Sequence, residues 1–213
     1  MMKIVESATI PALFVEQPDA KEHLDDISGA LAAGLGLTTI HRVRQVHGDR
    51  IVEDASGDGD GLIITKRGTG ALIRTADCFP VVLADKDRAL AGIFHCGWRG
   101  VELRLAAKGT RRLKELGARS LQAALFPGIE RCCFRIGSEL KDRFNDAGIP
   151  LETRGADLFA DLGAAIVDQL AGEGVGEIEE VTRCTACTPG LFSYRRDRDD
   201  RRHATIVWLP AGS

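Results

Sequence analysis

The sequence lacks a long hydrophobic run and a recognisable leader. Of its 213 residues, 44% are hydrophobic and 28% are charged, a composition typical of globular proteins. No apolar segment approaches the roughly 18 residues that a membrane-spanning helix requires. The N-terminal segment MMKIVESATIPALF carries a glutamate inside the stretch that a signal peptide would keep apolar. These absences predict a cytoplasmic protein that has no membrane partner.

The sequence also lacks a strong charge of either sign and a dense set of cysteines. Its 28 Lys and Arg residues nearly balance its 31 Asp and Glu residues, and the formal net charge is −3. The basic footprint of a nucleic-acid-binding protein is therefore absent. Six cysteines are too few for a disulfide scaffold, so we expect reduced thiols that pack, ligate or react.

Two further absences concern the organisation of the chain. No Pro/Ser-rich linker divides it, and no repeat with a period of roughly 20 to 50 residues runs through it. A chain of this length can bury a core as one large domain or as two small ones. We therefore predict a single domain over residues 1–213.

Short apolar segments separated by turn residues predict strands, and apolar residues three or four positions apart predict helices. The predicted strands cover residues 61–65, 71–76, 81–85, 90–95 and 204–209. The predicted helices cover residues 101–117, 138–148 and 157–174, with Ser138 and Asp157 as candidate N-caps of the last two. Because the strands are almost continuously apolar, we expect both faces of their sheet to be covered. The mixture predicts an α/β or α+β layered fold.

Three residues with metal-ligand side chains stand at the ends of strand-like segments. His47 precedes a Gly-Asp turn, Cys78 lies between two predicted strands, and His95 ends an apolar run. They are 31 and 17 positions apart, far wider than the local spacing of a zinc finger. Such spacing is typical of a site that a folded sheet assembles.

The residue types of this triad suit zinc. Zinc favours thiolate and imidazole, and three protein ligands leave a fourth position for water or substrate. At a catalytic site, zinc lowers the pKa of bound water to about 7. Read from spacing alone, each histidine could equally be a hydrogen-bonded structural residue and Cys78 a buried thiol. Cys78 could also be a nucleophile with His47 or His95 as its base.

The remaining cysteines give a weaker signal. Cys132 and Cys133 are adjacent and are expected to point to opposite faces. Cys184 and Cys187 form a Cys-x-x-Cys pair that could be half a zinc site or a redox pair, but no second such pair completes a four-thiolate cage. We therefore expect these four thiols to be buried packing residues.

Several motifs, taken in order and spacing, resemble the YfiH/laccase-domain family. They are RQVHG (44–48), DGLIIT (60–65), TADCFPVVLAD (75–85), FHCGWRG (94–100), FPGIERCCFRIGSEL (126–140), DLFADL (157–162) and CTACTPGLFSYRRD (184–197). The resemblance covers roughly residues 40 to 209. Members have been called multicopper polyphenol oxidases and, later, purine nucleoside phosphorylases. The resemblance implies a compact mixed α/β sandwich.

Carried over residue by residue, the family's metal ligands fall on His47, Cys78 and His95, which are then also the catalytic residues. The implied activity is zinc-dependent phosphorolysis of purine nucleosides such as adenosine, inosine and guanosine. Adenosine deamination and methylthioadenosine phosphorolysis would occur in the same pocket. The implied partners are a small-molecule nucleoside and phosphate, with the chain a monomer or small homo-oligomer. This chain carries Cys96 where members usually have alanine, and residues before 40 do not clearly match.

Phosphate and nucleoside would need further residues around the metal. Arginine suits phosphate because its planar fork binds two oxygens at once. The candidates are Arg44, Arg99, Arg195 and Arg196. Asp77, beside Cys78, could handle protons or could instead accept backbone N–H bonds as a structural residue. Trp98 and Phe79 could stack on a purine or pack in the core.

Three alternative functions stay open from the sequence. Copper-dependent oxidation of phenols would use the same ligand types, but only five histidines are present, and a multicopper site needs many. A cysteine hydrolase could use Cys78 without metal. The chain could also be a metal-binding or interaction module without catalysis. The H-x-E motif of the usual zinc deaminases is absent.

Overall fold

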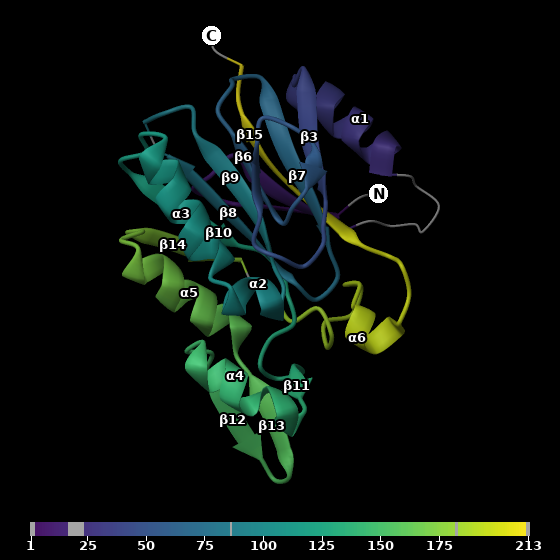
Figure 1. The fold of residues 1–213 in the computed structure, drawn as a ribbon. Helices are drawn as coiled ribbons and strands as arrows, with labels where there is room; N and C mark the ends of the chain where they lie inside the picture. Colours follow the sequence, from purple (N-terminus) through teal and green to yellow (C-terminus); the bar gives the residue numbers. More distant parts are fainter. Residues whose placement is uncertain (1–2, 17–23, 86, 182, 212–213) are drawn as a thin grey trace.

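The computed structural model describes residues 3–16, 24–85, 87–181 and 183–211, and places two six-stranded sheets face to face (Figure 1). The first sheet has the order β1 (Lys3–Glu6), β2 (Ala12–Glu16), β15 (His203–Leu209), β7 (Thr69–Thr75), β3 (Thr39–Arg44), β5 (Gly57–Asp58). The second has the order β14 (Glu177–Glu180), β10 (Leu121–Leu125), β8 (Phe79–Asp85), β9 (Ala91–Cys96), β6 (Gly61–Ile64), β4 (Ile51–Glu53). A small third sheet has the order β11 (Arg135–Ile136), β13 (Asp157–Ala160), β12 (Leu151–Arg154).

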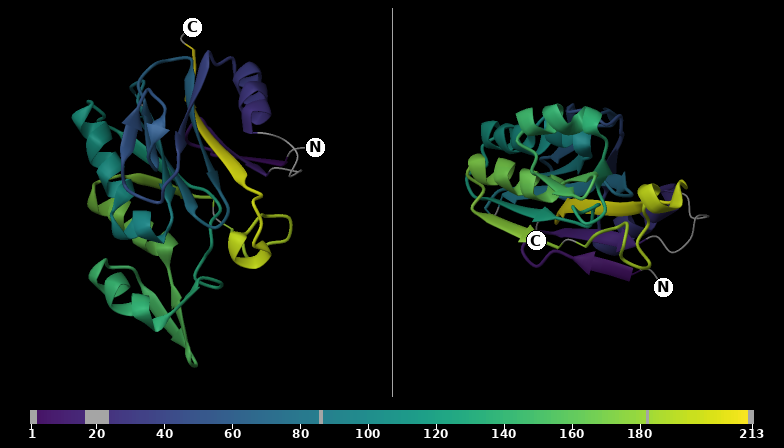
Figure 2. Two further views of the ribbon diagram at one scale, coloured as in Figure 1. Left: turned by 45° about the vertical axis from the view of Figure 1, so that its right-hand side comes forward. Right: turned by 90° about the horizontal axis from the view of Figure 1, so that it is seen from below.

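Helices cover the outer faces of the two large sheets (Figure 2). The helix α1 (Leu24–Leu35) packs on the first sheet, and α3 (Leu105–Glu115) and α5 (Leu162–Gly172) pack on the second. Shorter helical segments are α2 (Trp98–Glu102), the 3₁₀ turn η1 (Ser138–Leu140), α4 (Lys141–Asp146) and α6 (Tyr194–Asp197). In the described part of the chain, no helix has the length and apolar character needed to cross a membrane. The mixed α/β sandwich expected from the sequence is confirmed.

The alternation of side chains along the central strands explains their continuous hydrophobicity. In β6, Leu62 and Ile64 point into the core between the sheets, whereas Ile63 points toward the helices. In β9, Ile93 and Phe94 divide in the same way. Since side chains alternate along a strand, a strand covered on both faces must be apolar at every position. Both faces of the second sheet are therefore covered, as predicted.

Two predicted helices differ in extent from the observed ones. The predicted helix over residues 101–117 is interrupted, because Arg104 adopts a left-handed conformation with φ 59° between α2 and α3. The predicted helix over residues 138–148 begins as a 3₁₀ turn, and its N-cap residue is Gly137 instead of Ser138. Both predictions followed apolar spacing, which does not report a local change of backbone conformation.

The third predicted helix, over residues 157–174, begins later than expected. Residues 157–160 form strand β13, which pairs on one edge with β12 and on the other with β11. The helix starts after Asp161, whose carboxylate accepts the N–H of Ala164 at 3.0 Å. Asp157 therefore does not cap this helix. Pairing within the third sheet outweighs the helical spacing of these four residues.

Candidate functional site

The three predicted metal ligands converge at one end of the sandwich. His47 follows β3, Cys78 lies between β7 and β8, and His95 is the second-last residue of β9. One ligand atom from each side chain lies within 4.8 Å of the others. His95 is buried, Cys78 is half-buried and His47 is exposed. The group could therefore hold a metal ion with one side open to solvent.

Asp60 holds two of these ligands in place. Its fully buried carboxylate accepts the backbone N–H groups of Val46, His47 and Gly48 at 3.2, 3.0 and 2.7 Å. The same carboxylate lies 2.7 Å from Nδ1 of His95. It thereby supports the turn in which His47 adopts a φ of 58°. The sequence motif DGLIIT contains this aspartate, but its role was not predicted.

The contact with Asp60 also determines which nitrogen of His95 faces the cluster. A ligating histidine commonly donates its other ring N–H to a carboxylate, which fixes the ring orientation. With Nδ1 engaged by Asp60, Nε2 is the His95 atom available to an ion. The His47 and His95 rings approach edge to face, with centroids 4.8 Å apart.

The two histidines change the acidity of the thiol between them. Burial alone would raise the pKa of Cys78, but the charge on His95 and a hydrogen bond with His47 lower this pKa to about 6. Burial conversely disfavours charge on His95, but the Cys78 thiolate and Asp60 raise its pKa to about 9. Without metal, Cys78 is therefore held as a thiolate, the form that binds metal ions and acts as a nucleophile.

Gly97 leaves space for the Cys78 sulfur. A Cβ atom at this position would lie 2.8 Å from Cys78 Sγ and 3.6 Å from His47 Cδ2. A side chain at residue 97 would thus fill the place where the sulfur stands. The space beside Gly97, the fixed orientation of His95 and the three donor atoms, one sulfur and two nitrogens, together fit a divalent transition-metal ion.

Cys96 takes no part in this cluster. It is fully buried in the hydrophobic core beneath α3, and burial raises the pKa of its thiol well above the ordinary value. Because neighbouring residues of a strand point to opposite faces, Cys96 points away when His95 points toward the site. Its presence in place of alanine therefore affects packing.

Asp77 connects the Cys78 turn to the C-terminal segment. It has a φ of 93°, and its carboxylate accepts the Thr185 hydroxyl at 2.7 Å and the Arg195 backbone N–H at 2.6 Å. Of the two roles that the sequence left open for Asp77, these bonds correspond to the structural one, in which it accepts a backbone N–H. They also place α6 beside the residue that precedes Cys78.

The two adjacent arginines of α6 lie in different surroundings. Arg196 directs its guanidinium to Asp197 and to the carbonyl groups of Thr185, Ala186 and Leu191. All its donor nitrogens are thus engaged within the chain. Arg195 instead donates to the Arg135 carbonyl at 2.8 Å.

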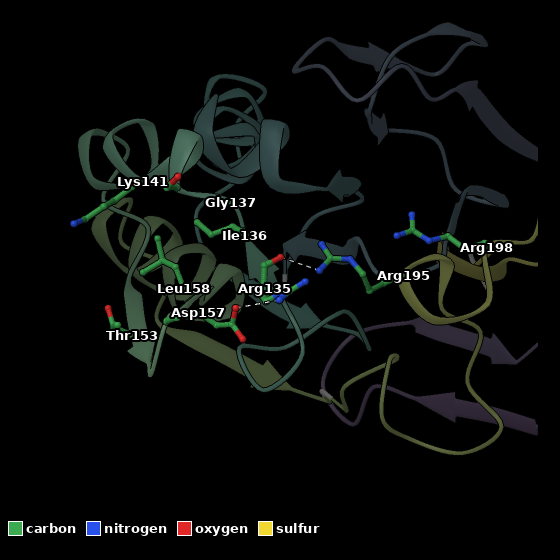
Figure 3. A pocket seen from close by; sticks show the side chains of 11 residues that line it. Arg135, Ile136, Gly137, Lys141, Thr153, Asp157, Leu158, Arg195 and Arg198 are labelled. Atoms are coloured by element: carbon green, nitrogen blue, oxygen red, sulfur yellow. Dashed lines mark hydrogen bonds and ion pairs between the residues drawn. The ribbon is translucent and has the colours of Figure 1, made fainter.

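Arg195 borders a cavity of about 740 Å³ between α6 and the third sheet (Figure 3). Arg135, Lys141 and Arg198 add positive charge to its lining, and Asp157 pairs with Arg135 at 3.0 Å. Figure 3 shows the Arg195 guanidinium directed at the backbone carbonyl of Arg135, whose own side chain pairs with Asp157. The cavity is large enough for a small organic ligand and carries an excess of cationic side chains.

The other two candidate arginines lie on the segments that carry the histidines. Arg44 ends β3 and forms an exposed ion pair with Asp58. Arg99 lies in α2, with its guanidinium carbon 4.1 Å from the centre of the Trp98 ring. Of the two candidate stacking residues, Phe79 is buried in the core and Trp98 is half-buried.

The fold and site define a mixed α/β protein with a candidate mononuclear metal site at the ends of its strands. A family model described as multi-copper polyphenol oxidoreductase laccase matches residues 13–210, and the chain belongs to this family. The match begins at residue 13 and so includes most of β2, although the sequence motifs suggested a start near residue 40.

Curated relatives carry another name. A purine nucleoside phosphorylase of Aquifex aeolicus is 34% identical over 177 residues, covering 81% of this chain and 84% of that protein. A purine nucleoside phosphorylase of Deinococcus radiodurans is 36% identical over 191 residues, covering 84% and 75%.

Solved structures share the fold. YlmD from Geobacillus stearothermophilus superposes with a TM-score of 0.81 at 23% identity, covering 95% of this chain and 93% of its own. YfiH from Bacillus licheniformis gives a TM-score of 0.77 at 23% identity, covering 92% of each chain. The predicted family is confirmed by the family model and the curated relatives, and these structures show the same fold.

Proposed function

We propose that this protein is a purine nucleoside phosphorylase whose active site is a zinc ion held by His47, Cys78 and His95. The observation that carries the proposal is the convergence of one sulfur and two imidazoles within 4.8 Å, with His95 oriented by a buried carboxylate. The purine nucleoside phosphorylases at 34 and 36% identity support the substrate class.

Zinc is proposed over copper because of the donor set. Three protein ligands with an open fourth position are the pattern of catalytic zinc. Copper in a His₂Cys site usually has a weak axial methionine. The only methionines are residues 1 and 2, so none lies in the described part of the chain. A multinuclear copper centre would also need more histidines than the two that converge.

The reaction exchanges one bond at the ribose. A phosphate oxygen bonds to C1′ while the bond from C1′ to the purine N9 breaks, and the proton of the phosphate ends on the departing base. The products are the free base and ribose 1-phosphate. When bound, zinc would supply a Lewis acid that stabilises negative charge at the open side of the site.

Arg195 is the proposed phosphate contact. It lines the cationic cavity, and its backbone is fixed by Asp77, next to Cys78. Arg44 and Arg99 are proposed as further substrate contacts because they are exposed and flank His47 and His95 in sequence. Asp77 is proposed to position Arg195 through its backbone N–H and not to contact the substrate itself. Arg196 is left out because its guanidinium is engaged by in-chain acceptors.

The test uses zinc-loaded protein with inosine and phosphate. We expect hypoxanthine and ribose 1-phosphate in equal amounts, lost after chelation and restored by zinc. Arg195→Ala should raise the KM for phosphate, because it removes a cation while keeping the backbone bond to Asp77. Arg111→Ala is the matched control, since Arg111 pairs with Glu173 between the helices α3 and α5. Zinc-loaded protein that forms no product would overturn the proposal.

Adenosine separates the proposed side activities. Phosphorolysis gives adenine and requires phosphate, whereas deamination gives inosine and ammonia and consumes water instead. Methylthioadenosine should give adenine in the presence of phosphate. An activity that survives chelation but is lost in Cys78→Ala would instead indicate a thiol nucleophile, as in a cysteine hydrolase.

A further inference from the structure

Four of the six cysteines converge at a second place, away from the candidate active site. One sulfur each from Cys132, Cys133, Cys184 and Cys187 lies within 4.8 Å of the others. We propose that these four residues form a structural zinc site. The proposal goes beyond the nucleoside reaction and does not depend on it.

Two turns bring the four sulfurs together. Cys132 and Cys133 lie in a turn in which the N–H groups of Cys133 and Phe134 both donate to the Glu130 carbonyl at 2.9 Å. Because this turn is not a strand, adjacent cysteines need not point to opposite faces, and that expectation was wrong. This turn supplies the second pair of thiols of the proposed site, which the sequence alone did not reveal.

The other half is the Cys184-x-x-Cys187 segment. It forms a turn closed by the Thr188 N–H, which donates to the Cys184 carbonyl at 3.0 Å. Paired cysteines with two residues between them are common ligands of structural zinc. The expectation of buried packing was also wrong for two of the four, because Cys132 and Cys187 are exposed.

The sulfur spacing suits an ion better than a disulfide. Cys132 Sγ and Cys187 Sγ are 3.8 Å apart, and all six cysteines are free thiols. A disulfide would need about 2.0 Å. Four sulfurs at about 2.3 Å from a tetrahedral zinc are separated by about 3.8 Å. The inorganic core of an iron–sulfur cluster would hold them further apart, so a single ion fits best.

The surroundings of the Cys184 sulfur favour a thiolate, and a cation lies near Cys132 and Cys133. Backbone groups of Glu130, Ala186 and Cys187 form hydrogen bonds with the Cys184 sulfur. Arg154 donates to the Cys132 carbonyl and lies close enough to Cys132 and Cys133 for a favourable charge interaction. A zinc ion with four thiolates carries two negative charges, and hydrogen bonds and a nearby cation offset such charge.

The site would join two loops that border the cationic cavity lined by Arg135 and Arg195. Cys133 lies two residues before Arg135, and Cys187 lies on the loop that leads to Arg195, which donates to the Arg135 carbonyl. Thr185, between Cys184 and Cys187, binds the Asp77 carboxylate beside Cys78. A zinc ion here would fix both walls of the cavity and support the Cys78 turn.

The test counts metal in protein purified with a reductant and without chelator. We expect two zinc ions per chain in the wild type and in the control Cys96→Ala, and one in Cys187→Ser and in Cys78→Ser. Cobalt in Cys78→Ser should give the intense sulfur-to-metal charge-transfer band of four thiolates, which the two-histidine site cannot produce. In the wild type, the exposed Cys132 and Cys187 should resist alkylation until chelator is added.

Three results would overturn the proposal. One is a zinc content that Cys187→Ser does not change. Another is a Cys132–Cys187 disulfide found by mass spectrometry in the reduced preparation, and the last is iron in place of zinc. If Cys78→Ser loses no zinc while Cys187→Ser does, the second site stands and the active-site proposal fails. The wild-type metal count and alkylation apply even where a variant does not fold.

Discussion

At the scale of single residues, Asp60 links the two histidines of the candidate active site. One of its oxygens serves His95 Nδ1 and the His47 N–H, and the other serves the N–H groups of Val46 and Gly48. A carboxylate can accept all four of these bonds because it has no hydrogen of its own when ionised. Burial disfavours its charge, yet these bonds hold the pKa of Asp60 below its usual range.

Asp60→Asn should weaken zinc binding by about 10–100-fold. The asparagine NH₂ group would face backbone donors, so the turn carrying His47 or the ring of His95 must shift. Competition with a chromogenic chelator measures the affinity. Asp58→Asn is the control, because Asp58 is an exposed partner of Arg44 and lies outside this network. Equal affinities in the two variants would contradict the role given to Asp60.

Cys78 should be unusually reactive in the metal-free protein. With a pKa of about 6, it is mostly thiolate at neutral pH, and its reactivity should fall as the pH drops through this value. Iodoacetamide labelling followed by peptide mass spectrometry measures the rate at each pH. The buried Cys96 serves as the internal control and should stay unlabelled. Labelling of Cys78 that rises only near the ordinary thiol pKa of 9.0 would contradict the assignment.

At the scale of elements, the contact between α3 and the second sheet depends on a helical glycine. Gly109 lies in the buried face of α3, where a Cβ atom would lie 2.3 Å from the Phe94 ring. The ring belongs to β9, the strand that also carries His95. The helix α3 therefore packs closely against the strand that carries His95.

Gly109→Ala should destabilise the protein by about 1–3 kcal/mol, because the Phe94 ring has no space to move aside in a packed core. Gly29→Ala is the matched control, since Gly29 lies exposed in α1 with no atom near its missing Cβ. There the better helix propensity of alanine should stabilise by up to about 1 kcal/mol. Urea unfolding measures both. A stabilised Gly109→Ala would show that the helix can move away from the sheet.

The same scale shows which elements a sequence can predict. Strands such as β6 and β9 were predicted because burial on both faces leaves an unbroken apolar run. Strand β13 was missed because Phe159 and Leu162 also fit helical spacing, and only pairing with β12 decides its form. The convergence of His47, Cys78 and His95 was predicted through motif resemblance. The contact of Asp60 with His95, 35 positions away, left no local signal.

At the scale of the whole molecule, His203 ties the C-terminal strand β15 to the loop before α6. It is fully buried, its ring lies 4.6 Å from that of Phe14 and 4.9 Å from that of Phe192, and its Nε2 accepts the Phe192 N–H at 2.8 Å. This nitrogen must be unprotonated to accept a bond. Burial accordingly lowers the pKa of His203 to about 4.

The ring of His203 should therefore contribute to the dependence of global stability on pH. The unfolded chain, with a histidine pKa of 6.5, binds a proton between pH 6.5 and about 4 that the folded chain excludes. Stability falls as the pH drops through this window, by about 3 kcal/mol in full. His203→Gln keeps an acceptor for the Phe192 N–H but cannot be protonated. Urea unfolding at pH 7.5 and 4.5 should show a smaller loss in this variant than in the wild type, and equal losses would mean that His203 is not the residue that couples folding to acid.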